Sequence, residues 1–320
     1  MRKSLKRWAS TVAMRFAPPG TPAVERFVMG HFDREPELAA RAFRQMRDSG
    51  RLTASDDPLA QAMVERACDF GYLGWPKRLQ RWVEGRDVLD VGCGTGLHAI
   101  GFALVGVRTY VGLDPKVRLD AERAKNTRVG RWEPFGWTPA EMMRVFPQIR
   151  LIQGSFESMA PDEQFDVAVL HNATEHIIAI DEVLGGIARR LRPQGRLIYN
   201  HHNFYCWNGH HMAPKTVRDL RADDVEQRQF VDWAHLRFEP PPGHYFHSGL
   251  NRIRLDELRR LTERHYVIET WNEIPTDEVR GGGRLTPEVL ASHPEYSHRE
   301  LSTQHVFCVA QPRVQARLAA

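Results

Sequence analysis

Three closely spaced glycines follow a short apolar run in the first third of the chain. They are Gly92, Gly94 and Gly96, and Asp90 stands just ahead of them. This pattern predicts a buried parallel strand that turns sharply into a helix. Glycine permits the turn, lets a ligand approach the backbone, and lets the helix pack closely on the strand. The chemistry that this favours is the binding of a nucleotide-type ligand.

A second apolar run ends in Asp114, which we place at the carboxyl end of the neighbouring strand. There the carboxylate can accept both hydroxyls of a ribose. Asp90 would repel a pyrophosphate but suits the ammonium or sulfonium end of an amino-acid-bearing nucleoside. The glycine spacing is G-x-G-x-G and not G-x-G-x-x-G, and no G-x-x-x-x-G-K-[ST] run occurs. These differences disfavour a dinucleotide and a P-loop nucleotide site.

The string over residues 87–96, with Asp114 after it, resembles the first motifs of class I S-adenosylmethionine-dependent methyltransferases. The resemblance covers about residues 70 to 200. It implies a doubly wound α/β fold with a mostly parallel, seven-stranded sheet, and S-adenosylmethionine as cofactor with S-adenosylhomocysteine as product. In this first part of the motif it assigns cofactor binding to Asp90, Gly92, Cys93, Gly94, Gly96 and Asp114.

Two later loops continue the resemblance. After the predicted third strand, over residues 151–153, the family holds the adenine, so Phe156 would stack on the ring beside a polar neighbour. After the predicted fourth strand, over residues 165–170, the chain crosses the site. The resemblance adds these cofactor-binding residues: Ser155, Phe156, Glu157, His171 and Asn172.

The alternation of strands and helices favours one doubly wound domain with additions. Helices are expected over residues 37–48, 58–70 and 255–264, and the last two strands over 266–274 and 305–310, with the last strand antiparallel. The predicted parts of the chain are a basic amphipathic arm (1–20), a helical cap (21–82), the cofactor-binding core (83–200), an acceptor-binding insertion (201–250) and the C-terminal part of the core (251–320).

Charge and cysteine content limit the partners. Five basic residues within the first sixteen account for the net charge of +4, and the rest of the chain carries about −1. The body therefore has no excess of positive charge for tracking phosphates, and we expect no nucleic-acid partner. The arm could lie on an anionic membrane surface, dock on the body as a lid helix, or be disordered. Four cysteines without a C-x-x-C pair, and an arm too broken for a signal peptide, favour a cytoplasmic protein, with the inner membrane face as the open alternative.

Eight histidines lie in loops that follow the predicted fourth and fifth strands, at the sheet edge where ligands bind in open parallel sheets. Three explanations stay open: a general base that takes a proton from the acceptor, ligands of a divalent metal, or ordinary loop hydrogen bonding. The base candidates are His202, His211 and His247, because their segments are additions to the minimal fold. No metal ligand is assigned, because the spacing matches no regular zinc motif and carboxylates are sparse nearby in the sequence. The eight clustered histidines are at positions 171, 176, 201, 202, 210, 211, 244 and 247.

The acceptor is predicted from loop composition. The loop at residues 171–174 is not the N-P-P-[YFW] type that holds base amines. Aromatic and histidine side chains suit a hydroxylated acceptor, and the segment over residues 203–211 weakly resembles bacterial methyltransferases of glycan and polysaccharide biosynthesis. We therefore predict O-methylation of a hydroxyl on a sugar or secondary metabolite. The alternatives are N-methylation of a small-molecule amine and a non-catalytic binding or scaffold module; the oligomeric state is left open.

Overall fold

The computed structural model describes residues 36–50 and 57–313. The predicted basic arm, residues 1–20, lies outside the described residues, so its membrane contact stays a prediction. The chain forms two compact units, residues 1–159 and 160–320, which we call unit 1 and unit 2. The finer division into five segments also stays a prediction.

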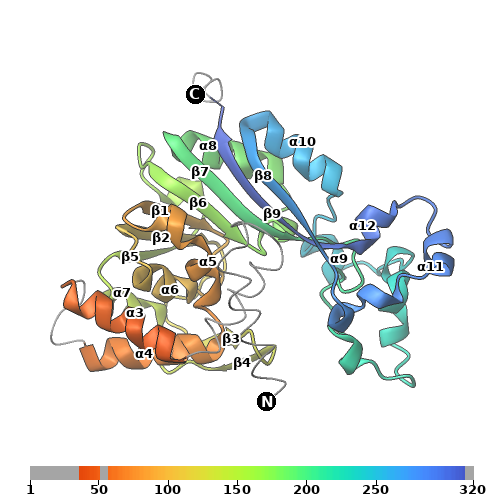
Figure 1. The fold of residues 1–320 in the computed structure, drawn as a ribbon, viewed down its shortest axis with the longest axis horizontal. Coiled ribbons are helices and arrows are strands. Elements are labelled where there is room, and N and C mark those ends of the chain that lie inside the picture. Colours follow the sequence, from red (N-terminus) through yellow and green to blue (C-terminus); the bar gives the residue numbers. More distant parts are fainter. Residues whose placement is uncertain (1–35, 51–56, 314–320) are drawn as a thin grey trace, which may run out of the picture. The chain divides into compact units, whose positions relative to one another are not determined.

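The described part of unit 1 combines three paired strands with a separate hairpin and α-helices. The elements are α3 (Pro36–Asp48), α4 (Asp57–Phe70), α5 (Gly74–Val83), β1 (Asp87–Val91), α6 (His98–Leu104), β2 (Thr109–Asp114), β3 (Arg123–Asn126), β4 (Arg131–Pro134), α7 (Pro139–Val145) and β5 (Ile149–Gln153). Strand β2 pairs in parallel with both β1 and β5. Helices α3 and α4 pack side by side (Figure 1), which confirms the two helices predicted in the cap.

Burial and capping explain why these short stretches are regular. All seven residues of α6 are buried, so this helix lies inside unit 1. Gly101 permits its close packing on α5, because a Cβ there would lie 2.7 Å from Pro76 Cγ. Helix α7 begins with a capping box in which the side chains of Thr138 and Glu141 each accept a hydrogen bond from the other residue's backbone N–H.

Up to residue 313, unit 2 has four strands, of which β6 and β7 are parallel. The elements are β6 (Phe165–His171), α8 (Ile180–Arg190), β7 (Leu191–His202), α9 (Tyr245–Ser248), α10 (Leu255–His265), β8 (Tyr266–Pro275), α11 (Pro287–Ala291), α12 (His298–Ser302) and β9 (Thr303–Pro312). Strand β9 pairs antiparallel with both β7 and β8. The last strand is therefore inserted antiparallel, as predicted.

The strands form one seven-stranded sheet in the order β5-β2-β1-β6-β7-β9-β8. This confirms the predicted fold class. A two-stranded sheet of β3 and β4 accompanies it and was not predicted. Among the described residues, no helix has the length and apolar character needed to cross a membrane.

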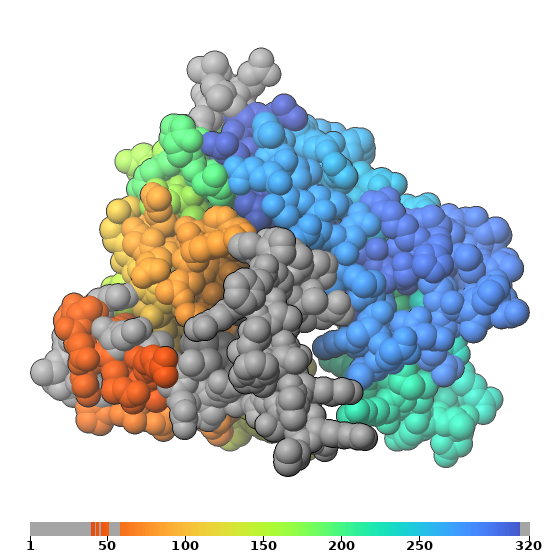
Figure 2. Space-filling model, viewed as in Figure 1, coloured from red at the N-terminus to blue at the C-terminus, as the bar shows by residue number. Residues whose placement is uncertain are grey.

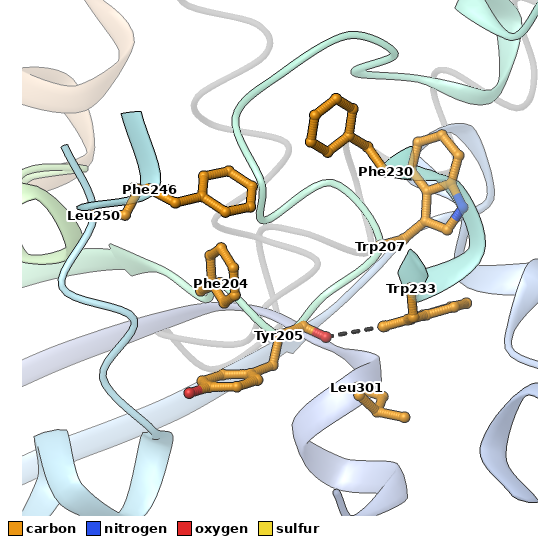
Figure 3. Close-up of a cluster of buried hydrophobic side chains, with 8 residues drawn as sticks. All are labelled: Phe204, Tyr205, Trp207, Phe230, Trp233, Phe246, Leu250 and Leu301. Carbon is orange, nitrogen blue, oxygen red and sulfur yellow. Dashed lines mark hydrogen bonds between the residues drawn. The ribbon is translucent and has the colours of Figure 1, made fainter. Parts of the chain in front are cut away.

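The predicted insertion is organised around an aromatic cluster within unit 2. Trp233 Nε1 donates to the carbonyl of Tyr205 at 3.0 Å (Figure 3). The segment over residues 278–302 adjoins the insertion (Figure 2), and Arg284 is ion-paired with Asp232. The cluster consists of the buried side chains of Phe204, Tyr205, Trp207, Phe230, Trp233, Phe246, Leu250 and Leu301.

Candidate functional site

The glycine-rich turn follows β1 in unit 1. Gly92, Gly94 and Gly96 have φ angles of 77°, 61° and 76°, in the left-handed region that favours glycine. The N–H of Gly92 donates to the carbonyl of Leu113 at 2.8 Å, which fixes the start of the turn against β2. The backbone conformation therefore explains why this stretch needs glycine.

Two of these glycines have opposite surroundings. A Cβ on Gly94 would meet nothing within 4 Å, so the backbone there faces open space. A Cβ on Gly96 would lie 2.6 Å from Leu151 Cδ1 of β5. Gly94 thus leaves room for a ligand, whereas Gly96 lets the turn pack on the sheet.

Asp90 lies on β1 beneath the turn and is 1% exposed. Its Oδ2 accepts a hydrogen bond from the Tyr110 hydroxyl at 2.6 Å. Its Oδ1 is buried and has no hydrogen-bond partner among the described residues. Burial raises the pKa of Asp90 to about 7, against the lowering effect of the Tyr110 hydroxyl. A donor or cation brought to Oδ1 would favour the carboxylate.

Asp114 joins the turn to the next strand. Its Oδ2 accepts from the N–H of Gly94 at 2.9 Å, and its Oδ1 accepts from the N–H of Lys116 at 2.7 Å. The N–H of Gly154 donates to the Asp114 carbonyl at 3.2 Å, which holds the start of the following loop beside this acid. In that loop Phe156 is half-buried. Ser155 and Glu157 are exposed on either side of Phe156 and hydrogen-bond each other through their side chains.

Cys93 points into the protein and is buried. Its Sγ would lie 2.9 Å from a Cβ on Gly112, so the thiol packs against β2. Burial, with the nearby carboxylates of Asp90 and Asp114, raises the pKa of this thiol well above its ordinary value. We therefore assign Cys93 a packing role beneath the turn, and its predicted ligand contact stays a prediction.

His171 and Asn172 lie at the end of β6 in unit 2. Asn172 has a φ of 50° and its Oδ1 accepts from Asn200 Nδ2 at 2.7 Å. His171 pairs in register with Asn200 of β7. These contacts position the end of the strand, and the predicted role of both residues in cofactor binding stays a prediction.

A polar group in unit 2 brings together residues from three segments. Glu175, His202 and His211 each offer a ligand atom, and these atoms all lie within 4.8 Å of one another. The ring centroids of His202 and His211 are 4.7 Å apart, and those of His176 and His211 are 5.0 Å apart. Two of the three candidate bases are therefore neighbours, and they share a carboxyl group that the sequence had not assigned.

Burial keeps this group uncharged. It raises the pKa of Glu175 to about 8 and lowers that of His202 to about 4. The pKa of His211 is lowered by burial and by the neighbouring histidines, His202 foremost. At neutral pH a protonated Glu175 thus lies beside two neutral imidazoles.

The third base candidate, His247, has different surroundings. It is exposed on α9, and its Nε2 lies 3.1 Å from the Pro240 carbonyl. Because a carbonyl only accepts, Nε2 carries the proton and Nδ1 keeps its lone pair. On the same short helix, the Tyr245 hydroxyl lies 3.2 Å from His176 Nδ1.

Other clustered histidines have structural partners. His201 Nδ1 lies 2.9 Å from the Thr174 hydroxyl, and His210 stacks on Phe230 at 5.2 Å. His244 accepts from the N–H of Phe246 and caps α9. The aromatic residues at 204–207 are core residues, so the expectation that they pack on an acceptor is wrong for this segment.

A family model described as a methyltransferase domain matches residues 75–265, more than half of the chain. The chain belongs to this methyltransferase family. Among curated relatives, the methyltransferase is 30% identical over 129 residues to a cypemycin N-terminal methyltransferase of Streptomyces sp, covering 39% of this chain and 45% of that protein. It is 28% identical over 123 residues to the ubiquinone biosynthesis O-methyltransferase of Rhodopseudomonas palustris strain BisA53, covering 38% of this chain and 42% of that protein. These matches span less than half of either relative's length.

Among solved structures, the methyltransferase is similar to a putative S-adenosylmethionine-dependent methyltransferase from Listeria monocytogenes. The two are 16% identical with a TM-score of 0.42, over 73% of this chain and 96% of that chain. The glycine motif and Asp114 imply S-adenosylmethionine as the cofactor, and unit 1 fits it in two ways. The buried Asp90 Oδ1 lacks a partner among the described residues, and a Cβ would fill the open space beside Gly94.

Sequence reasoning missed the residues that brace the turn of the methyltransferase. The Tyr72 hydroxyl donates to the carbonyl of Lys125 at 2.7 Å and accepts from the Thr95 hydroxyl at 3.3 Å. The Tyr72 carbonyl accepts from Nδ1 of the buried His98 at 3.0 Å. Helix α5 and strand β1 separate Tyr72 from the glycine motif in the sequence, and no local pattern marks Tyr72 as a neighbour of the turn.

Proposed function

We propose that this methyltransferase transfers the methyl group of S-adenosylmethionine to a hydroxyl oxygen of a sugar or secondary metabolite. The uncharged polar group of Glu175, His202 and His211 in unit 2 carries this proposal. A protonated carboxyl donates a hydrogen bond and a neutral imidazole accepts one, and a hydroxyl complements both. A cationic amine would instead require carboxylates that stay ionised.

On the cofactor side, we assign Asp90 and the turn at Gly94 to the methionine portion, Asp114 to the ribose and Phe156 to the adenine. Bound S-adenosylmethionine supplies an electrophilic methyl group on a sulfonium and leaves as S-adenosylhomocysteine. As the acceptor oxygen bonds to the methyl carbon, the carbon–sulfur bond breaks and the hydroxyl proton passes to a base. Alignment of the three atoms contributes more to the rate than the base does.

Among the three base candidates, we assign His247 as the general base that takes the hydroxyl proton of the acceptor. The Pro240 carbonyl fixes its tautomer, so Nδ1 keeps a lone pair, and the ring is exposed. Burial lowers the pKa of His202 and of His211, which makes both weak proton acceptors at neutral pH. We assign these two residues to binding of the acceptor.

Location and acceptor class belong to the same proposal. All four cysteines are buried and free, which is typical of a reducing compartment and supports a cytoplasmic enzyme.

One relative is named for O-methylation in ubiquinone biosynthesis and another for N-terminal methylation. N-methylation of an amine is therefore the second candidate function.

The test incubates the full chain with S-adenosylmethionine carrying a ¹³C-methyl group and with fractions of glycans, small metabolites and peptides. We expect label in a glycan or small-metabolite fraction, with the carbon chemical shift of an O-methyl group. An N-methyl shift, or label in peptides, would refute the hydroxyl acceptor.

Single variants then test the base. We expect His247→Ala to lower kcat about a hundredfold or more at neutral pH, and to lose the limb of the pH–rate profile that reports the base. We expect His202→Ala and His211→Ala to raise the KM of the acceptor. An unchanged kcat and pH profile in His247→Ala would remove this assignment.

A further inference from the structure

The polar group of unit 2 has the composition of a metal-binding site. It offers one carboxylate oxygen from Glu175 and one imidazole nitrogen each from His202 and His211. Two ligand atoms of one tetrahedral zinc ion lie about 3.4 Å apart, given bonds of about 2.1 Å. The three atoms lie within 4.8 Å of one another, so small side-chain rotations would bring them into one coordination shell.

Two of these ligand groups have atoms without a partner. Glu175 is 2% exposed, and its Oε1 has no hydrogen-bond partner among the described residues. The same is true of the buried Nε2 of His211. Leaving a buried polar atom unsatisfied is unfavourable, so such atoms call for a ligand. Thr174 already bonds the other carboxylate oxygen, Oε2, at 3.3 Å, which orients the Glu175 side chain.

The third ligand group is oriented by residues behind it. Asn208 Nδ2 donates to the carbonyl of Lys215 at 3.3 Å, which directs Oδ1 toward His202. His202 Nε2 lies 3.3 Å from that Oδ1, so Nε2 carries the proton and Nδ1 keeps the lone pair. Gln304 Nε2 also donates to the same oxygen at 3.3 Å. A histidine whose second nitrogen bonds an oxygen acceptor is the usual arrangement at metal sites.

We propose that Glu175, His202 and His211 bind a Zn²⁺ ion, which displaces the proton that Glu175 carries in the metal-free protein. The donor set of two nitrogens and one oxygen suits zinc, and it disfavours Mg²⁺ and Ca²⁺, which prefer oxygen ligands. Three protein ligands leave a coordination position open, as in catalytic zinc sites. The position could take an acceptor hydroxyl and polarise it. Only this last role rests on the proposed function; the existence of the site does not.

The experiment measures metal binding to the full chain after treatment with a chelator. Isothermal titration with Zn²⁺ gives the stoichiometry, and Co²⁺, which substitutes for zinc, gives a visible absorption spectrum. We expect one Zn²⁺ per chain, a Co²⁺ spectrum that zinc abolishes, and at least a hundredfold weaker binding of Mg²⁺. Absence of Zn²⁺ binding, or binding of Mg²⁺ with equal affinity, would overturn the proposal.

Variants assign the ligands. We expect Glu175→Gln, which keeps the size of the side chain, and His211→Ala each to weaken Zn²⁺ binding at least tenfold. The control His298→Ala removes an exposed histidine of α12 and should bind zinc like the wild type. Thermal melting and S-adenosylmethionine affinity confirm that each variant is folded. Retained binding in the first two variants, or loss in the control, would contradict the assignment. Because no acceptor is used, failure of the O-methylation proposal leaves this test unaffected.

Discussion

In unit 1 the candidate cofactor residues come mainly from one continuous stretch, Asp90 to Gly96, with Asp114 beside it. In unit 2 the polar group draws Glu175, His202 and His211 from three segments. The first site is formed largely by backbone conformation, because its glycines provide positive φ angles and open space. The second is formed by side chains that only tertiary packing brings together.

This difference explains what a sequence can show. A turn that requires glycine at fixed spacing leaves a local pattern, because no other residue adopts that backbone at low cost. A cluster of side chains leaves no regular spacing in the sequence, because its members lie on strands and loops far apart in the chain. The same insertion also holds aromatic residues that look like a binding surface and are core.

The largest expected effect tests whether the insertion's aromatic residues are core or binding surface. Phe204 is 6% exposed and packs edge-to-face on Phe246 at 5.3 Å. We expect Phe204→Ala to lower the free energy of unfolding by about 3 to 5 kcal/mol, measured by urea unfolding. The control Tyr245→Ala removes an aromatic side chain that is 39% exposed and should cost less than about 1 kcal/mol. If Phe204→Leu raised the acceptor KM at unchanged stability, Phe204 would belong to the binding surface instead.

The next effect tests the backbone site in unit 1. The space beside Gly94 is open, and we expect the methyl group of Gly94→Ala to weaken S-adenosylmethionine binding about a hundredfold, or about 2.8 kcal/mol. Gly130 is the matched control, since it also has a positive φ, 71°, and no atom within 4 Å of its Cβ position. Both variants should lose about 1 to 2 kcal/mol of stability from backbone strain. Equal cofactor affinity in the two variants would show that the ligand does not approach Gly94.

Much of the fold was predictable because its signals are local. The predicted helix over residues 255–264 and strand over 165–170 agree with α10 and β6 within a residue. Apolar periodicity and short buried runs carry this information. The hairpin of β3 and β4 was missed because β4 is largely exposed and neither short strand has an apolar run.

The candidate sites were predictable to different degrees for the same reason. The turn at Gly94 and the acid at Asp114 lie where the motif places them. Glu175 directly precedes His176, but 27 positions separate it from His202, and no local spacing indicates that these two residues are partners. The path of β6 and β7, which are paired in parallel, brings the two segments together, and no spacing rule encodes that path.

The smallest expected effect tests whether the loss of stability in acid comes from burial of a lone histidine in unit 1 or from the clustered histidines of unit 2. His98 of unit 1 is buried, its Nδ1 lies 3.0 Å from the Tyr72 carbonyl, and burial lowers its pKa from 6.5 to about 4. The unfolded chain therefore binds an extra proton between these pH values, so stability falls as the pH drops below 6.5. His98→Asn keeps a donor for Tyr72 and cannot titrate. We expect this variant to lose about 2 kcal/mol less stability than the wild type between pH 7 and pH 5, measured by urea unfolding. The exposed His298→Asn should follow the wild type. An unaltered pH dependence in His98→Asn would mean that the histidines of unit 2, and not burial in unit 1, govern the acid sensitivity of the fold.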